Sequence, residues 1–204
     1  MTEPITYPSL TALAQAEARC TRCPLYKNAT QVVPGQGSPR SRLVLVGEQP
    51  GDKEDLAGAP FVGPAGRVLD RAIAEAGLER RKVFVTNAVK HFKFEQRGKR
   101  RLHKKPNAYE IDRCRWWLEQ ELGLIKPELV VALGASALRS LIGKPMAIAK
   151  LRGRAYPLPD GTPLVATIHP SYLLRIQDDD DKAAEYGRFV NDLRLCAKLL
   201  EKAA

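Results

Sequence analysis

Four short apolar runs constrain the fold of this chain more than any other feature, because a stretch with helical periodicity lies between each pair of them. Runs of this length bounded by polar residues are typical of buried strands, and helical connections make neighbouring strands parallel. The runs lie at 42–47 (RLVLVG), 82–89 (KVFVTNAV), 128–134 (ELVVALG) and 164–168 (LVATI). We therefore expect an α/β fold, with residues 1–204 forming one αβα sandwich around a central, mostly parallel four-stranded sheet.

Punctuating residues mark the helices between these runs. Pro64 stands at the start of one amphipathic stretch and Gly77 at its end, and Asn107 can cap another helix. Residues 91–106 carry no such pattern and are expected to form a basic loop. The expected helices lie at 8–19, 64–77, 107–123, 135–141 and 182–202.

Polar segments follow all four predicted strands. They are GEQPG (47–51), TNAVKH (86–91), GAS (134–136) and HPS (169–171). Open α/β sheets bind ligands beyond the carboxyl ends of their strands. If the strands are parallel, Glu48, Gln49, Asn87 and His169 should share one crevice.

The charge balance favours a polyanionic partner. Lysine and arginine outnumber acidic residues by 33 to 23, for a formal net charge of +10, although this excess by itself does not specify nucleic acid. No run approaches the roughly 20 apolar residues that span a bilayer, and the N-terminus lacks the pattern of a secretory signal. We expect a cytoplasmic protein, in which the CxxC pair Cys20 and Cys23 indicates metal or redox chemistry rather than a disulfide.

Longer motifs carry a family resemblance over roughly residues 15–200. GEQPGDKEDLAGAPFVGPAGR (47–67), TNAVKH and HPS resemble the uracil-DNA glycosylase superfamily. The CxxC pair and Cys114 resemble its iron-sulfur-bearing branch. GKRRLHKKP (98–106) resembles the loop of X-type (UdgX) enzymes, which bond covalently to uracil-DNA; Leu102 stands where that pattern usually has isoleucine. The resemblance implies a DNA-repair enzyme of the bacterial cytosol or nucleoid, a hydrolase of the N-glycosidic bond.

The resemblance gives the strand-end residues specific roles. An extruded base needs an aromatic face and hydrogen bonds to its pairing edge, which Phe61 and Asn87 can supply. His169 can donate to uracil O2, Glu48 can stabilise the cationic sugar or orient the nucleophile, and Gln49 can position base or backbone. Without the resemblance, core packing for Phe61 and a turn role for Asn87 would be the simpler interpretations. Further substrate contacts are expected from Gly47, Gly51, Asp52 and Ser171.

The basic insert surrounds one histidine, His103, with cations. A solvated, disordered loop is the common interpretation of such a run, whereas the resemblance implies a DNA-facing loop. It further implies that His103 attacks the sugar C1′ where other members of the superfamily use water. The run comprises Arg97, Lys99, Arg100, Arg101, Lys104 and Lys105. DNA contacts are expected from Lys99, Arg100, Arg101, Lys104 and Arg175.

The resemblance also implies a four-iron, four-sulfur (4Fe-4S) cluster with a structural role. Its ligands would be Cys20, Cys23, Cys114 and His91, which stands where the related branch has cysteine. Cys196 is the rival fourth ligand, but it falls on an apolar helical stripe. Zinc is the alternative metal, because three cysteines and one histidine are a common zinc set.

Several functions remain open on these grounds. The first is a monomeric, single-turnover glycosylase that prefers single-stranded uracil-DNA and has no membrane partner. The second is an ordinary multiple-turnover glycosylase that uses water. The third is a non-enzymatic module that binds uracil-DNA or single strands. A CxxC redox protein is the least supported, because no thioredoxin-like βαβ unit follows the pair.

Overall fold

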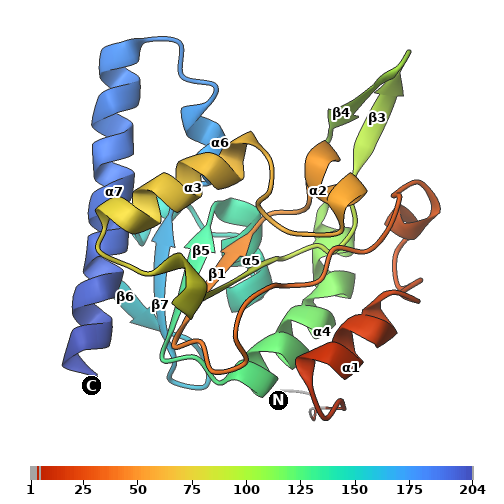
Figure 1. Cartoon of the computed structure of the whole chain (residues 1–204), viewed down its shortest axis with the longest axis horizontal. Helices are drawn as coiled ribbons and strands as arrows, with labels where there is room; N and C mark the ends of the chain where they lie inside the picture. Colours follow the sequence, from red (N-terminus) through yellow and green to blue (C-terminus); the bar gives the residue numbers. More distant parts are fainter. Residues whose placement is uncertain (1–3, 5, 204) are drawn as a thin grey trace.

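The computed structural model describes residue 4 and residues 6–203, which form a sheet with helices on both faces (Figure 1). Its strand order is β2-β1-β5-β7-β6, and every pairing is parallel except that of β6 with β7. The predicted α/β fold and its four parallel strands are confirmed; the short antiparallel edge strand β6 was missed. The strands are β1 (Leu43–Gly47), β2 (Val83–Asn87), β5 (Leu129–Leu133), β6 (Ala155–Pro157) and β7 (Pro163–Thr167).

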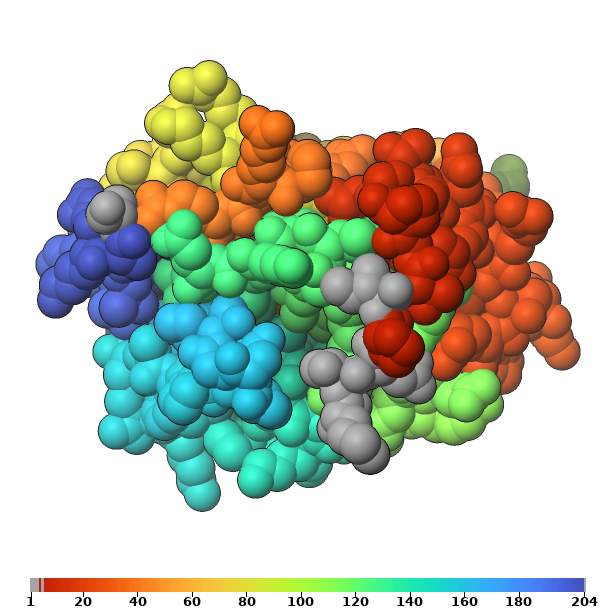
Figure 2. Space-filling view, turned by 90° about the horizontal axis from the view of Figure 1, so that it is seen from below, coloured from red at the N-terminus to blue at the C-terminus, as the bar shows by residue number. Residues whose placement is uncertain are grey.

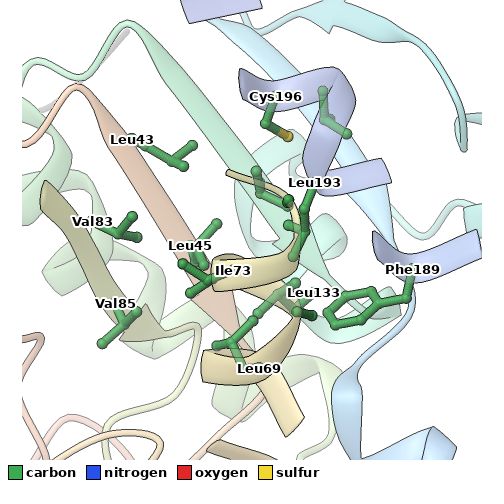
Figure 3. Packing of buried hydrophobic residues seen from close by; sticks show 14 of the residues in the cluster. Leu43, Leu45, Leu69, Ile73, Val83, Val85, Leu133, Phe189, Leu193 and Cys196 are labelled. Carbon is green, nitrogen blue, oxygen red and sulfur yellow. The ribbon is translucent and has the colours of Figure 1, made fainter. Parts of the chain in front are cut away.

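Two helical layers cover the sheet because alternate strand residues face opposite sides. Helices α3 (Pro64–Glu75) and α7 (Asp179–Lys202) pack on one face, against Leu43, Leu45 and their neighbours (Figure 3). Helices α4 (Ala108–Ile125) and α5 (Ala135–Ile142) pack on the other face, against Val44 and Val46. Both faces of the sheet are buried under helices, which explains why the strands are continuous apolar runs.

The helix boundaries follow local chemistry. Pro64 is the first residue of α3, and the Asn107 side chain accepts a hydrogen bond from Glu110 N at 2.9 Å to cap α4. Asp178 caps α7, so the acidic run at 178–181 lies at a helix N-terminus, where negative charge is favourable.

Helix α1 (Leu10–Glu17) lies against α4, on the side of the molecule opposite α7. Figure 2 shows the same separation from below, with the N-terminal segment in red and the last helix in blue. Among the described residues, 3-10 turns lie at Pro24–Lys27, Arg80–Lys82 and Ile148–Lys150.

The basic insert is not the loop that the sequence predicts. Strands β3 (Phe94–Arg97) and β4 (Arg100–His103) form an antiparallel hairpin that projects beside the short helix α2 (Asp52–Ala57) (Figure 1). Gly98, with φ of 56°, supplies the left-handed residue that a two-residue hairpin turn requires. Helix α2 and the short helix α6 (Pro170–Leu173) directly follow β1 and β7 and were likewise not predicted.

The strand order places a topological switch point at β1, because β2 pairs on one side of it and β5 on the other. Such a point opens a crevice beyond the carboxyl ends of the strands. Within the described ranges, no helix combines the length and apolar character needed to cross a bilayer.

Candidate active site at the carboxyl edge of the sheet

The aromatic and amide groups of the predicted pocket meet at Gly47, the last residue of β1. Gly47 pairs in register with Asn87 of β2. A Cβ at Gly47 would lie 2.3 Å from Asn87 Oδ1 and 2.6 Å from Phe61 Cζ, so only glycine lets both side chains approach the strand. The structure therefore places Phe61 and Asn87 side by side at the end of β1.

Phe61 is held by an uncommon backbone conformation. Its φ is 58°, in the left-handed region that bulky residues rarely adopt. A Cβ on Gly66 of α3 would lie only 1.6 Å from the carbonyl oxygen of Phe61. Only glycine at position 66 therefore leaves room for this turn. Strain of this kind persists where the surroundings hold it, and it is concentrated at functional sites.

Glu54, in α2, connects the two loops of this pocket. Its carboxylate accepts from Gly63 N at 2.6 Å and from Gly51 N at 3.1 Å. These bonds tie the turn after β1 to the segment that carries Phe61. Glu54 was not predicted from the sequence, although a glutamate three residues after Gly51 is the pattern of a reciprocal helix cap. Gly51 therefore shapes the turn through its backbone.

His169 faces the same pocket from the end of β7. Its ring is stacked with that of Phe61, with centroids 6.1 Å apart and planes 25° apart. Ser171 N donates to His169 Nδ1 at 3.2 Å, and Ser171 Oγ lies 2.8 Å from the same atom. Burial, with smaller effects of His103 and Arg175, lowers the pKa of His169 to about 4. The neutral ring therefore carries its proton on Nε2, which is free to donate to a ligand.

Glu48 and His103 come together although they lie far apart in the sequence. His103 Nε2 lies 3.6 Å from Glu48 Oε1, and the other carboxylate oxygen accepts a 2.5 Å hydrogen bond from Ser136 Oγ. Burial lowers the pKa of His103 below 6.5; the charge of Arg175 lowers it further and Glu48 opposes both. His103, about half exposed, is thus a largely neutral imidazole at neutral pH, with a lone pair available.

The side-chain amide of Gln49 forms hydrogen bonds with the two chain segments at the base of the hairpin and is not directed into the Phe61–Asn87 pocket. Its Nε2 donates to Lys93 O at 3.1 Å and to Lys104 O at 3.0 Å, while its Oε1 accepts from Lys93 N at 3.2 Å. Gln49 joins the turn after β1 to the strand that carries His103.

Arg101 anchors the hairpin to α2. It forms ion pairs with Asp52 at 2.7 Å and with the fully buried Asp55 at 2.6 Å, and its guanidinium lies over the rings of Phe92 and Phe94. A phosphate contact by Arg101, or a substrate contact by the Asp52 carboxylate, would have to compete with this pairing. Asp55 was not predicted from the sequence as part of the site.

The remaining predicted DNA contacts lie around this hairpin. Lys99 and Arg100 are exposed at its tip and border a hollow of about 500 Å³ that Leu56 and Leu102 line with apolar surface. Lys104 is exposed and pairs with Glu95 at 2.7 Å. Arg175 is exposed after α6, and its charge acts on both His103 and His169.

Three of the four cysteines gather on the α1 side of the molecule. Cys20, Cys23 and Cys114 belong to one buried cluster with Trp117, whose Nε1 donates to Cys20 Sγ at 3.1 Å. Lys90 N donates to Cys114 Sγ at 3.2 Å, and the adjacent His91 is buried. Among the described residues, no three His, Cys, Asp or Glu side chains are close enough to hold one metal ion.

Cys196 lies apart from these residues. It lies on α7 near Leu193, in the core cluster between the sheet and the helices α3 and α7, and is fully buried (Figure 3). Its thiol donates to Asp192 O within α7 at 3.3 Å. Its surroundings are those of a core side chain.

Comparison with known proteins shows the family of this chain. Residues 34–194 match the model of the Uracil DNA glycosylase superfamily. The chain is 39% identical over 163 residues to a type-4 uracil-DNA glycosylase of Thermotoga maritima, covering 79% of this chain and 81% of the relative. A type-4 uracil-DNA glycosylase of Pyrobaculum aerophilum is 36% identical over 186 residues, or 86% of this chain and 87% of the relative. A type-5 uracil-DNA glycosylase of Thermus thermophilus is 35% identical over 159 residues, covering 68% of each chain. The chain belongs to the uracil DNA glycosylase superfamily.

Proposed function

We propose that this protein excises uracil from DNA and then remains attached to the sugar through His103. One observation carries the covalent step: the hairpin holds His103 Nε2 3.6 Å from Glu48, beside the pocket formed by Phe61 and Asn87. Family membership and the type-4 relatives support uracil excision itself. The reaction therefore combines the pocket of the superfamily with a nucleophile on the inserted hairpin.

Base recognition follows from the pocket. Phe61 offers a ring face for stacking, and the Asn87 amide can pair with the N3–H and O4 of uracil. Cytosine presents the opposite donor and acceptor at both positions, so the same amide would leave buried groups unpaired. Gly47 makes this selection possible by leaving room for both side chains.

Cleavage of the glycosidic bond creates negative charge on uracil and positive charge on the sugar, and the neighbouring side chains can stabilise both charges. The C1′–N1 bond breaks with its electron pair going to uracil, and His169 Nε2 donates a hydrogen bond to O2 as negative charge develops there. Glu48 stabilises the cationic sugar. His103 Nε2 then uses its lone pair to form a bond to C1′, and the resulting imidazolium loses the proton on its other ring nitrogen to solvent, while the uracil anion takes a proton from solvent.

The decisive experiment is denaturing electrophoresis of the protein with uracil-containing single-stranded DNA, together with an assay of released uracil. The wild-type chain should shift to a covalent complex, and His103→Ser should lose the shift while still releasing uracil, because water can take the place of the imidazole. A wild-type chain that releases uracil over many turnovers without shifting would be an ordinary glycosylase. Binding without release would instead indicate a non-enzymatic uracil-DNA module.

We further infer that Cys20, Cys23, His91 and Cys114 hold a 4Fe-4S cluster. The cysteines are buried together, and two of their sulfurs accept N–H hydrogen bonds, as ligand thiolates in such clusters do. A cluster spreads its four ligands over four irons, whereas zinc needs all four around one ion. Metal analysis of the purified protein distinguishes the two metals. When bound, the cluster would tie the N-terminal loop and α4 to the segment that leads into the hairpin.

The substrate and setting of this activity are part of the same proposal. Exposed Lys99 and Arg100 border an open hollow, and Arg175 is exposed as well; such cations suit a flexible single strand, whose phosphates they can contact one by one. We propose that the protein acts as a monomer on DNA in the cytoplasm. Binding of single-stranded and duplex uracil-DNA at several salt concentrations would test the strand preference.

A further inference from the structure

Ser136 occupies a position that the predicted reaction roles leave unexplained. It is the second residue of α5, directly after β5, and only 2% of it is exposed. Its hydroxyl donates to Glu48 Oε2 at 2.5 Å. Glu48 follows β1 and Ser136 follows β5, so this bond spans the switch point of the sheet.

The same helix contains a serine without such a partner. Ser140 is 1% exposed, and its hydroxyl makes no hydrogen bond within the described structure. Burial of a serine in α5 therefore does not by itself call for a carboxylate partner. The contact of Ser136 is specific to the end of the helix that faces Glu48.

The bond to Ser136 has a geometric consequence at His103. The two oxygens of a carboxylate are rigidly related, so holding Oε2 also sets the direction of Oε1. Oε1 is the atom that lies 3.6 Å from His103 Nε2. Without this hydrogen bond the Glu48 carboxylate could rotate, and its negative charge would no longer be held at a defined position beside the sugar and the imidazole.

We propose that Ser136 is a positioning residue that holds Glu48 toward the sugar and His103, and so sets the balance between the covalent adduct and free abasic product. It acts through Glu48 and does not itself touch the substrate. The inference rests on the proposed function. It adds a residue of β5–α5 to a site whose other members follow β1, β2 and β7 or lie on the hairpin.

The test is single-turnover reaction of the full-length protein with uracil-containing single-stranded DNA, measuring both released uracil and the fraction crosslinked. Ser136→Ala should slow uracil release about tenfold and lower the crosslinked fraction of the product, because a charge-assisted hydrogen bond is lost. Ser140→Ala, the matched control, should leave both quantities unchanged. Equal losses in both variants, or none in Ser136→Ala, would overturn the proposal.

A double-mutant cycle separates positioning from a general loss of stability. If Ser136 acts through Glu48, Ser136→Ala should have no further effect in a Glu48→Ala background. An undiminished effect in that background would refute the inference. A wild-type protein that releases uracil but never crosslinks would contradict the covalent step at His103. The release rates of the variants would still test the positioning role of Ser136. A wild-type protein that releases none would overturn the proposed function and this inference together.

Discussion

At the scale of single residues, the pocket depends on glycine, which has no side chain, at two positions. Gly47 leaves the space in which Asn87 and Phe61 approach the end of β1, and Gly66 does the same for the backbone of Phe61. His169 depends on its surroundings in another way, because burial and the Ser171 N–H together keep the ring neutral with its proton on Nε2. The two glycines and the protonation of His169 therefore determine which atoms of the pocket would contact a base.

Gly47→Ala should lower uracil release by about 100-fold or more, because its Cβ would displace Asn87 and Phe61 from their positions. Gly187→Ala is the control. A Cβ on Gly187 meets nothing within 4 Å in α7, so that variant should keep full activity and gain about 0.5–1 kcal/mol of stability. Single-turnover kinetics and thermal unfolding of both variants provide the comparison, and normal release by Gly47→Ala would contradict the assigned pocket.

His169 should make stability depend on pH in a defined range. Its pKa is about 4 in the folded chain, against 6.5 for an ordinary histidine, so the unfolded chain binds the proton more readily. The stabilising contribution is full above 6.5 and is lost as pH falls from 6.5 toward 4. His169→Gln should therefore lose less unfolding free energy than wild type over this range in denaturant titrations. Identical pH dependence of the two proteins would show that His169 is not held neutral.

At the scale of elements, the β3–β4 hairpin carries the nucleophile and is tied to the body at several points. Gln49 binds both chain segments at its base, and Arg101 joins β4 to Asp52 and Asp55 of α2. The ladder pairs His103 with Phe94, whose ring stacks on Phe92. The insert is therefore a rigid support, whereas a disordered basic loop could not hold an imidazole at a fixed distance from Glu48.

Arg101→Ala should release this support. The buried carboxylate of Asp55 would lose its guanidinium partner, which costs about 1–3 kcal/mol, and His103 would no longer be held beside Glu48. We expect at least about a tenfold loss of crosslinking rate, with a smaller loss of uracil release. Arg97→Ala is the control, since the ion pair of Arg97 in the described part of the chain is with Glu95 on the same strand. Limited proteolysis of the hairpin would report the loosening, and equal crosslinking by both variants would contradict the anchoring role.

At the scale of the whole molecule, the cysteines divide into two groups on opposite sides of the sheet. Cys114 and Cys196 are both helical, fully buried thiols whose pKa burial raises to about 12. Only Cys114 lies with Cys20 and Cys23, beside the segment that leads into the hairpin. A cluster at this place would link three distant parts of the chain, so its binding energy would contribute to folding.

Cys114→Ala should therefore lose bound iron and visible absorbance, and should unfold at a lower temperature. Cys196→Ala, matched in burial and helical setting, should keep its iron. Metal analysis and absorption spectra of protein from an iron-sufficient host provide the measurement, and His91→Ala extends it to the fourth ligand. Iron lost from the Cys196 variant but retained by the Cys114 variant would reverse the assignment, and stoichiometric zinc in the wild type would replace the cluster with a zinc site.

Local patterns determined the framework of this protein. The apolar runs predicted four strands, and Pro64 and Asn107 marked helix starts, because periodicity and capping act within a few residues of sequence. The hairpin was missed because its strands are charged and lack an apolar alternation, although Gly98-Lys99 was an available turn signal. Basic residues in a run resemble a solvated loop until their partners are known.

Only the tertiary structure decided which polar groups pair. The bonds of Ser136 to Glu48, of Arg101 to Asp55 and of Gln49 to the hairpin base join residues 44 to 88 positions apart. Composition and spacing cannot specify such pairs, because each depends on where the sheet and its crossovers bring the strand ends. The sequence by itself therefore determined the strands and the kinds of side chain at their ends, and long-range packing determined which atoms of those side chains face one another.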